Sequence, residues 1–569
     1  MAHYPRFAAI AAALAAGSVL LISCEGGNTT MSEREQVEER NDEAPAGPIV
    51  PEASTFFSTA YVEPKSTYHT PSNGDLWPVA WGPDDVMYTA NGDGKGFDVL
   101  SEWADIVVSK FTGNPWERNI TGERIASGDA VGRVWSDPEK YNKKPTGMIS
   151  VNGELYLAVQ DLNKETEGGR IFNDVPAATI LKSTDKGVTW TGATDAPMFK
   201  DHTFTTIMFL DYGKDSANNT FDEYVYAYGM DYNWRDSFSN TVPDPQHLYL
   251  ARMPKDAIQD AARWEYYTGD LKGKASWSAP GDIAARKPVL TDERRVYNER
   301  VMPGLTSLSV LSQGSIVYNK PLDRYLYTSW TEFTFEFYEA PTPWGPWKLF
   351  LSKDFGAYPW TLDRHGGYAT VIPSRFISED GTEMWLNSNT FVGGVENYNF
   401  SLRKLKVTPY RETKPENKKS DDNLARVGEN ATPISRAAEN GDLFRIADGD
   451  RSLQESSFNG EIKEEDFWGF TWSRSYNLNK LVYTAGDTHE QLGGWFEDVR
   501  VQVRQKFEWK DVEKLTVSPA YPGDATSGPK KTYAFAFKDT WGDGVRLIGK
   551  PGGSETYTTI TELEVYYAK

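Results

Sequence analysis

Short stretches of alternating apolar and polar residues recur along the chain from about residue 55 onward. They are rich in Tyr, Val, Leu and Trp, and they are separated by turns that contain Gly, Asp, Asn and Pro. Such alternation is typical of β-strands with one buried face, whereas stretches with the 3.6-residue period of a helix are scarce. The pattern therefore predicts an all-β protein.

The strand-like stretches between residues 55 and 407 group into five successive units. One unit contains "GMISVNGELYLAVQDL" and "ATILKSTDKGVTW", and the next contains "EYVYAYGMD", "LYLARMPKD" and "WEYYTGD". A repeat of this size is typical of the blades of a β-propeller. We therefore predict a five-bladed β-propeller over residues 55–407.

Two hairpins carry a turn motif that supports this prediction. Ser183–Trp190 reads "STDKGVTW", and Ser378–Trp385 reads "SEDGTEMW". The first matches the Asp-box, S-x-D-x-G-x-T-W, of propeller sialidases and related proteins, and the second is a degenerate version. In this motif the Asp caps the turn, the Gly adopts a positive φ and the Trp packs between strands. We interpret both turns as structural, and they favour a propeller over a sandwich.

The rest of the chain indicates a second domain. Residues 408–422 are charged and contain Pro, which predicts a linker. Residues 423–569 resemble the discoidin, or coagulation-factor C-type, β-sandwich in the opening "NLA", the turn Ala447–Asp450, and the closing "VRL" and "ITELEV". In bacterial surface proteins such modules usually bind sugars, so the resemblance implies a carbohydrate-binding domain.

Some residues of this second domain are candidates for ligand binding. Five aromatic side chains could stack on sugar rings, although such residues more often belong to a core. They are Trp468, Trp472, Trp495, Tyr521 and Trp541. The spacing of Asp448 and Asp450 would suit a structural Ca²⁺, and it suits a simple turn equally well. No cofactor is expected to be required.

The N-terminus predicts export and anchoring. Arg6 and the apolar run Phe7–Ile22, which is too short for a comfortable membrane span, predict a signal peptide over residues 1–23. The run ends in "LISC", which resembles the bacterial lipobox and implies lipidation of Cys24, the single cysteine of the chain. The alternative is an ordinary secretory signal with an incidental cysteine.

The residues after Cys24 and the net charge indicate where the protein is located and which partners it does not bind. Residues 24–54 are charged and almost free of aromatic side chains, which predicts a flexible tether. A formal net charge of −21 argues against a nucleic-acid partner, because binding phosphates requires Lys and Arg. We expect a lipid-anchored protein of the bacterial cell envelope that faces the periplasm or the outside.

The propeller stretch itself resembles five-bladed propeller glycoside hydrolases, most closely the bacterial domain of unknown function 4185, whose members include endo-D-arabinanases. The resemblance is carried by "GDLWPVAW" from Gly74, "YTANGDG" from Tyr88, "KPTG" from Lys144 and "YEAPTPWGPW" from Tyr338. It implies two catalytic aspartates in the first blade, at the positions of Asp75 and Asp93, and a polysaccharide substrate of arabinan type.

The chemistry of the two aspartates agrees with that implication. Glycoside hydrolysis commonly uses one carboxylic acid and one carboxylate that acts as base or nucleophile. Asp75 precedes "LWP", whose aromatic ring could desolvate the carboxyl and raise its pKa toward the acid role. Asp93 lies in "NGDG", where glycines permit close approach of substrate and local amides could stabilise the ionised form. Each aspartate could equally serve as a turn residue.

Other residues near the expected ends of inner strands are candidates for substrate binding. They are Trp77, Arg133, Lys144, His202, Asp231 and His365. Asp231 is also the candidate for a third carboxylate that tunes or positions the acid. Arg and His side chains would bind sugar hydroxyls or a carboxylate of the substrate.

The sequence thus predicts a membrane-anchored glycoside hydrolase, and two alternatives stay open. One is a polysaccharide lyase, in which His202, His365 or Tyr368 removes a proton next to a uronate carboxylate that Arg133 or Arg364 neutralises. The other is a glycan-binding lipoprotein without catalytic activity. A sialidase is a weaker match, because an arginine triad and a Tyr–Glu nucleophile pair cannot be assigned.

Overall fold

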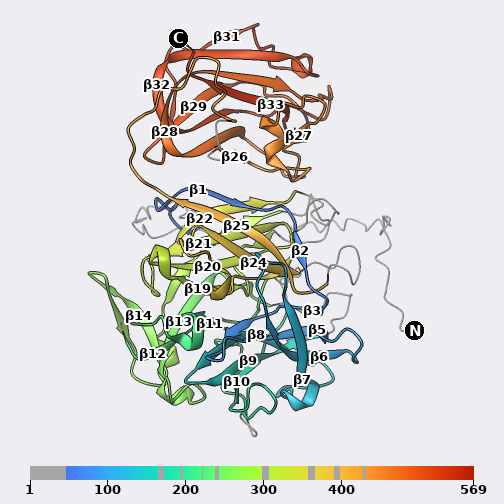
Figure 1. Cartoon of the computed structure of the whole chain (residues 1–569), viewed down its shortest axis with the longest axis vertical. Helices are drawn as coiled ribbons and strands as arrows, with labels where there is room; N and C mark the ends of the chain where they lie inside the picture. The colour runs from blue at the N-terminus through green and yellow to red at the C-terminus, as the bar shows by residue number, and fades with distance from the viewer. Residues whose placement is uncertain are drawn as a thin grey trace, which may run out of the picture. The chain divides into compact units, whose positions relative to one another are not determined.

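The computed structural model describes residues 47–164, 172–192, 196–220, 222–236, 242–297, 307–356, 366–389, 398–426 and 431–568. These residues form β-strands joined by turns and 3-10 helices of three to five residues (Figure 1). The predicted all-β class is therefore confirmed. The predicted signal peptide, Cys24, most of the tether and His365 lie outside the described residues.

Strands β1 to β25 form the curled sheets of a propeller, and we number their antiparallel groups as blades 1 to 5 in chain order. Blades 3 and 4 are hydrogen-bonded into one ten-stranded sheet, so the predicted count of five separate blades stays a prediction. Blade 1 contains β3 (Asn73–Asp75), β4 (Val79–Trp81), β5 (Met87–Gly96), β6 (Ala104–Thr112) and β7 (Thr121–Ser127). Blade 2 contains β8 (Tyr141–Val151), β9 (Glu154–Asn163) and β10 (Ala177–Ser183). Blade 3 contains β11 (Thr206–Asp211), β12 (Tyr224–Met230), β13 (His247–Pro254), β14 (Glu265–Leu271), β15 (Lys274–Trp277) and β16 (Pro288–Thr291).

The last two blades complete the ring. Blade 4 contains β19 (Ser315–Asn319), β20 (Arg324–Trp330), β21 (Thr334–Ala340) and β22 (Lys348–Asp354), and the short pair β17 (Arg295–Val296) and β18 (Leu308–Ser309) precedes it. Blade 5 contains β23 (Tyr368–Val371), β24 (Glu383–Asn389) and β25 (Ser401–Pro409). Two strands from the start of the described chain, β1 (Phe57–Val62) and β2 (Tyr68–His69), also pair with β25.

The pairing of β1 with β25 closes the propeller. The register is antiparallel, with Val62 opposite Leu405 and Ala60 opposite Val407, so the blue first strand lies beside the yellow last one (Figure 1). The first strand of the sequence therefore belongs to the last blade. This pairing ties the start of the propeller chain to its end.

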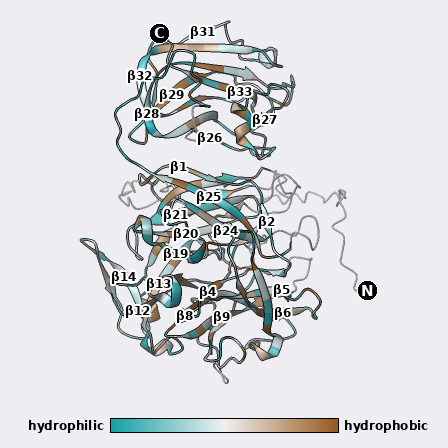
Figure 2. Ribbon diagram, in the orientation of Figure 1, coloured by the Kyte–Doolittle hydropathy of each residue, from teal (hydrophilic) through white to brown (hydrophobic). Residues whose placement is uncertain are grey.

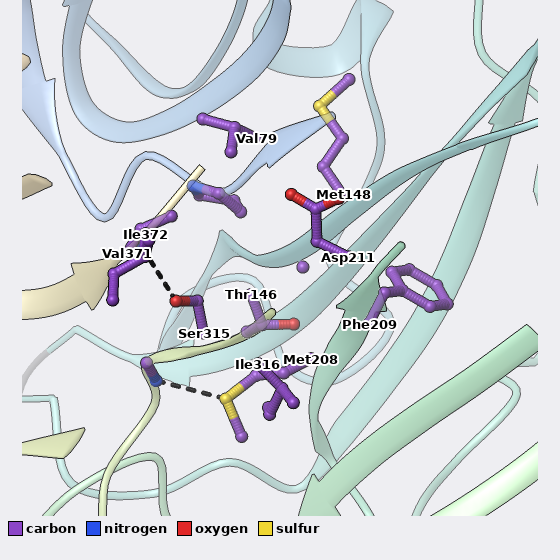
Figure 3. A pocket seen from close by; sticks show the side chains of 13 residues that line it. Val79, Thr146, Met148, Met208, Phe209, Asp211, Ser315, Ile316, Val371 and Ile372 are labelled. Carbon is purple, nitrogen blue, oxygen red and sulfur yellow. Dashed lines mark hydrogen bonds between the residues drawn. The ribbon is translucent and has the colours of Figure 1, made fainter. Parts of the chain in front are cut away.

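One strand from each of the five blades lines one small cavity, and in blade 1 this strand is β4. The cavity volume is about 30 Å³, and Val79, Thr146, Met208, Ser315 and Val371 each contribute to its lining from a different blade (Figure 3). Blades 3 and 4 are also joined directly, because β11 and β19 pair in parallel.

The two Asp-box turns have the structure that the sequence predicted. Asp185 accepts hydrogen bonds from Ser183 Oγ at 2.8 Å and from Thr189 N at 2.9 Å, while Gly187 has φ +90°. In the second turn, Asp380 accepts from Ser378 Oγ at 2.7 Å and Thr382 N at 3.0 Å. Their role is structural, since each carboxylate caps its own hairpin.

Strands β26 to β33 form a β-sandwich. They are β26 (Ala431–Ser435), β27 (Glu455–Ser456), β28 (Asp466–Ala485), β29 (Arg500–Gln505), β30 (Glu508–Asp511), β31 (Thr516–Ser518), β32 (Thr532–Gly549) and β33 (Thr559–Tyr566). Apolar and polar residues succeed one another along the strands here and in the propeller (Figure 2). Trp468 and Trp472 are fully buried in the sandwich core, and Trp495 is 7% exposed, so these three rings pack rather than face solvent.

The turn at Asp448 and Asp450, where the sequence allowed a calcium ion, is closed by its own hydrogen bonds. Asp448 accepts a hydrogen bond from Asp450 N, and Asp450 accepts two from Ser452, which are the bonds of a capped turn. A calcium ion there stays a prediction.

The end of the predicted tether is bound to blade 4, because Ser54 N donates to Leu349 O and Leu349 N donates to Glu52 O. Within the described part of the chain, no helix has the length and apolarity that crossing a membrane requires.

Candidate active site

The candidate site begins where the inner edge of blade 1 is interrupted. Both β3 and β4 pair with β5, and between them Leu76 and Trp77 adopt φ values of +71° and +48°. Asp93, in β5, has φ +37°. Residues other than glycine seldom adopt such conformations, and where they do the residues around them must hold them in place. The interruption places Asp75 at the end of β3, directly before the two residues of positive φ.

Glycines of "NGDG" make room for this turn. Asp75 is paired with Gly92, and a Cβ atom added to Gly92 would lie 2.5 Å from Oδ1 of Asp75. A Cβ atom on Gly94 would lie 2.4 Å from the carbonyl oxygen of Asn73. Both distances are too short for real atoms, so the absence of side chains is what allows the two strands to approach at the site.

Asp75 has a buried carboxyl group, and only one of its two oxygens accepts hydrogen bonds from the described residues. The residue is 6% exposed, and its Oδ2 accepts hydrogen bonds from the hydroxyl groups of Tyr398 at 2.5 Å and Tyr368 at 3.3 Å. Its Oδ1 is buried and has no hydrogen-bond partner among the described residues. Tyr368 begins β23 and Tyr398 precedes β25, so both tyrosines come from blade 5.

The pKa of Asp75 is raised to about 6. Burial is the largest cause, because it disfavours the charged carboxylate, and the negative charge of Asp93 adds to it. The positive charge of Lys144 and the two tyrosine hydroxyls act in the opposite direction. Asp75 is therefore a carboxyl group that holds its proton in mildly acidic solution.

Asp93 has a different environment. Lys144 in β8, which is 2% exposed, forms an ion pair with Oδ1 of Asp93 and donates a second hydrogen bond to the carbonyl oxygen of Asp105 at 3.2 Å. The side chain of Asp93 is 22% exposed. The site thus combines a buried proton-holding carboxyl with a partly exposed, ion-paired carboxylate, and each affects the other electrostatically.

Trp77 does not line the site. Its ring is fully buried and packs edge-on against Phe97 and Phe400, with centroids 5.7 and 5.6 Å away. Its Nε1 donates to the carbonyl oxygen of Gly74 at 2.9 Å. The expectation that Trp77 contacts substrate is therefore wrong, and the residue instead anchors the turn that carries Asp75. Burying a large apolar ring among other rings stabilises the folded chain more than leaving it in contact with water.

Two other candidates, Arg133 and Asp231, interact with residues other than the two aspartates. Arg133 is exposed and acts electrostatically on Asp161, whose buried carboxylate accepts hydrogen bonds from Trp135 N and Ser136 N. Asp231 binds Arg286 at 2.6 Å and Phe204 N at 2.8 Å. The structure thus gives Asp231 partners in blade 3 in place of the expected role beside the acid.

His202 belongs to a second polar cluster. Its Nε2 lies 2.7 Å from Oδ1 of Asp174, and the hydroxyl of Tyr141 donates to Oδ2 of the same carboxylate at 2.7 Å. His202 also stacks on Tyr232. This cluster lies near the start of β8 and β11, on the side of the propeller where the inner strands begin.

The sequence did not single out several residues that shape the site. Tyr398 donates to Asp75, and Asn389 donates to the carbonyl oxygen of Gly74 at 2.9 Å. Arg235 is buried, which lowers its pKa to about 10, and it pairs with Glu332. No local motif marks these residues. The only available signal was the clustering of aromatic and amide side chains near the ends of later strands.

Comparison with known proteins bears on the propeller. Residues 79–354 match the family described as a domain of unknown function, DUF4185. The matched stretch includes Asp93 and Lys144, and Asp75 lies just before it. No curated protein matches the chain.

Solved structures also resemble the chain. One, from Bacteroides ovatus ATCC 8483 and provisionally described as a hydrolase, is 14% identical with a TM-score of 0.38, and the match covers 64% of this chain and 97% of that one. CpGH89CBM32-5 from Clostridium perfringens, in complex with GalNAc-β-1,3-galactose, is 15% identical with a TM-score of 0.19 over 24% of this chain and 94% of that one. The family 32 module of Clostridium perfringens NanJ, in complex with galactose, is 12% identical with a TM-score of 0.20 over 24% and 93%.

Proposed function

We propose that the protein is a glycoside hydrolase that cleaves a polysaccharide, with Asp75 as general acid and Asp93 as base or nucleophile. The observation that carries the proposal is the unequal pair of carboxyl groups. Asp75 has a pKa raised to about 6 and an unengaged, buried Oδ1, while Asp93 is ion-paired with Lys144. In glycosidases, two neighbouring carboxyl groups take the acid role and the base or nucleophile role because their environments differ. The group whose pKa is raised keeps its proton and acts as the acid.

The reaction follows from these positions. Asp75 gives its proton to the glycosidic oxygen while the bond from that oxygen to the anomeric carbon breaks, and the electron pair of the bond stays on the leaving oxygen. Asp93 either accepts a proton from a water molecule that attacks the anomeric carbon, or attacks that carbon itself and forms a glycosyl ester. In the second case water then hydrolyses the ester, and the deprotonated Asp75 accepts the proton of that water. Lys144 holds the Asp93 carboxylate in place through the ion pair. The arabinan type of substrate is proposed on the sequence resemblance.

The lyase alternative has less support from the same residues. Burial and the neighbouring Asp75 raise the pKa of the Tyr368 hydroxyl far above its ordinary value, which makes it a poor base. The ring of His202 is engaged by Asp174 and stacked on Tyr232. His365 and Arg364 lie outside the described residues.

The remaining parts of the proposal concern location. We propose that Cys24 carries a lipid anchor and that residues 423–569 bind a glycan, on the sequence resemblances described above. Anchoring beside a bound polysaccharide would raise the local concentration of cleavable bonds without a new catalytic contact. Radiolabelled fatty acid incorporation, compared with a Cys24→Ser variant, tests the anchor.

The test of the enzyme is a screen of the full chain against a panel of polysaccharides that includes arabinan, with reducing ends and product masses measured. Asp75→Asn and Asp93→Asn should each lower the rate by a factor of at least ~10³, the scale on which catalytic acids and bases act together with positioning. Asp98→Asn is the matched control, because Asp98 is an exposed aspartate of the same strand region. Release of unsaturated uronates, seen by their ultraviolet absorbance, would favour the lyase. Glycan binding without any product would favour the non-catalytic alternative.

A further inference from the structure

A pair of stacked rings is exposed on blade 3, where His202 precedes β11 and Tyr232 follows β12. The rings of His202 and Tyr232 have centroids 5.7 Å apart and an interplanar angle of 20°. Tyr232 is 44% exposed, and the side chain of His202 is 34% exposed. Exposed aromatic faces with a polar edge are the surfaces on which sugar rings stack and to which their hydroxyls bind.

The pair is held rigidly by its neighbours. Asp174 binds Nε2 of His202 at 2.7 Å and is itself fixed by the hydroxyl of Tyr141 at 2.7 Å. Tyr232 N donates to the carbonyl oxygen of His202 at 2.8 Å, and Val175 N donates to that of Tyr232 at 2.9 Å. These bonds fix both rings before any ligand arrives, which lowers the entropy lost on binding. The Nδ1 atom of His202 is then the ring nitrogen that can meet a sugar hydroxyl.

The backbone around the pair is strained. Asp201, His202 and Tyr232 adopt φ values of +55°, +60° and +65°. Such conformations are disfavoured for these residue types, and they gather at ligand sites where the surroundings enforce them. Asp231 contributes to the enforcement, because its Oδ1 accepts from Phe204 N at 2.8 Å and thereby fixes the turn that carries His202.

A short chain segment connects the pair to the catalytic aspartates. Tyr232 and Arg235 are three residues apart, a separation of at most ~11 Å in extended chain. The Arg235 guanidinium lies 5.8 Å from the Trp330 ring, which lies 5.6 Å from the ring of Tyr368. Tyr368 donates to Asp75. The stacked pair and Asp75 are therefore linked by a continuous run of contacts through Arg235, Trp330 and Tyr368.

We propose that His202 and Tyr232 form a distal subsite for the polysaccharide, which binds a sugar unit several residues away from the cleaved bond. Asp174 and Asp231 are positioning residues of this subsite. The proposal rests on the proposed function and specifies its substrate as a glycan chain long enough to reach from Asp75 to the stacked pair. A site built in this way favours long chains over short oligosaccharides.

The test measures kcat/KM of the full chain on a ladder of oligosaccharides cut from arabinan, or from the polysaccharide that the screen above identifies. Tyr232→Ala should cause a loss that grows with chain length and reaches about tenfold on the longest members, an effect of the size that aromatic contacts give. His202→Ala should behave in the same way, and Tyr232→Phe should retain most of the activity. Trp116→Ala is the control, because Trp116 is 40% exposed but follows the end of β6 that lies away from Asp93.

Each outcome has a distinct meaning. A loss that is equal for all chain lengths, or no loss on any, would overturn the subsite. If Tyr232→Ala does not fold, as judged by circular dichroism, His202→Ala and His202→Gln decide the question. If no glycan is cleaved by the unmodified protein, the proposed function fails. The subsite is then tested by affinity electrophoresis in gels that contain arabinan, where unchanged migration of Tyr232→Ala relative to the unmodified protein would overturn it.

Discussion

Replacing Asp75 by Asn should abolish activity and stabilise the propeller at the same time. The pKa of this carboxyl is raised from 3.8 to about 6, chiefly by burial. A carboxyl whose pKa is higher in the folded than in the unfolded chain favours folding while it is protonated. That contribution is fully present below pH 3.8 and is lost as the pH rises through 6.

The size of the effect follows from the shift. A difference of about two pKa units corresponds to ~3 kcal/mol of stability that the folded protein lacks at pH 8 and has at pH 3 to 4. Asn keeps the shape of Asp, and its amide oxygen can accept from Tyr398 and Tyr368, but it carries no charge to desolvate. A propeller of about 350 residues unfolds with an entropy of ~0.7 kcal/mol/K, so ~3 kcal/mol raises its melting temperature by ~4 °C.

The measurement is differential scanning calorimetry of Asp75→Asn and the unmodified chain at pH 4, 6 and 8, with Asp98→Asn as the control. We expect the two melting temperatures to coincide near pH 4 and to separate progressively above pH 5, with Asp75→Asn the higher. The reasoning would be refuted if Asp75→Asn melted below the unmodified protein at pH 8, or if the difference between them did not change with pH.

Two further predictions concern the same carboxyl group. Tyr398→Phe removes a hydrogen bond to the charged form of Asp75, a bond worth ~1.5–3 kcal/mol, and should raise its pKa by ~1–2 units. Because the acid must be protonated, the alkaline limb of the profile of kcat/KM against pH should shift to higher pH. A shift to lower pH would contradict the assignment. Gly92→Ala places a Cβ atom 2.5 Å from Oδ1 of Asp75 and should lower kcat by more than about tenfold. Full activity of Gly92→Ala would show that Oδ1 does not need its present position.

The sequence predicts what depends on local patterns. The alternation of apolar and polar residues identifies strands, and the Asp-box motif identifies the turn at Asp185. The glycines of "NGDG" were expected to let substrate approach, and the structure shows that they let two strands approach. Each of these features is decided by neighbouring residues, since strand faces, turn caps and glycine conformations depend on a few positions at a time.

Features that depend on contacts between distant segments were missed. Nothing near Phe57–Val62 indicates that it pairs with residues of the last blade, because the partner of an edge strand is chosen by the closure of the ring. Tyr398 follows no motif, although it donates to Asp75 across 323 positions of sequence. Trp77 and Asp231 were expected to face substrate, but burial and an ion pair respectively give them other partners.

The distance in sequence between Asp75 and its tyrosine partners has a consequence for biosynthesis. The carboxyl is supplied by the first blade, and both hydroxyls that bind it are supplied by the last. On a nascent chain that has not yet reached Tyr398, Asp75 is an ordinary hydrated aspartate with an ordinary acidity. The environment that raises the pKa of Asp75, and with it the proposed acid role, therefore forms only when the first and last blades meet.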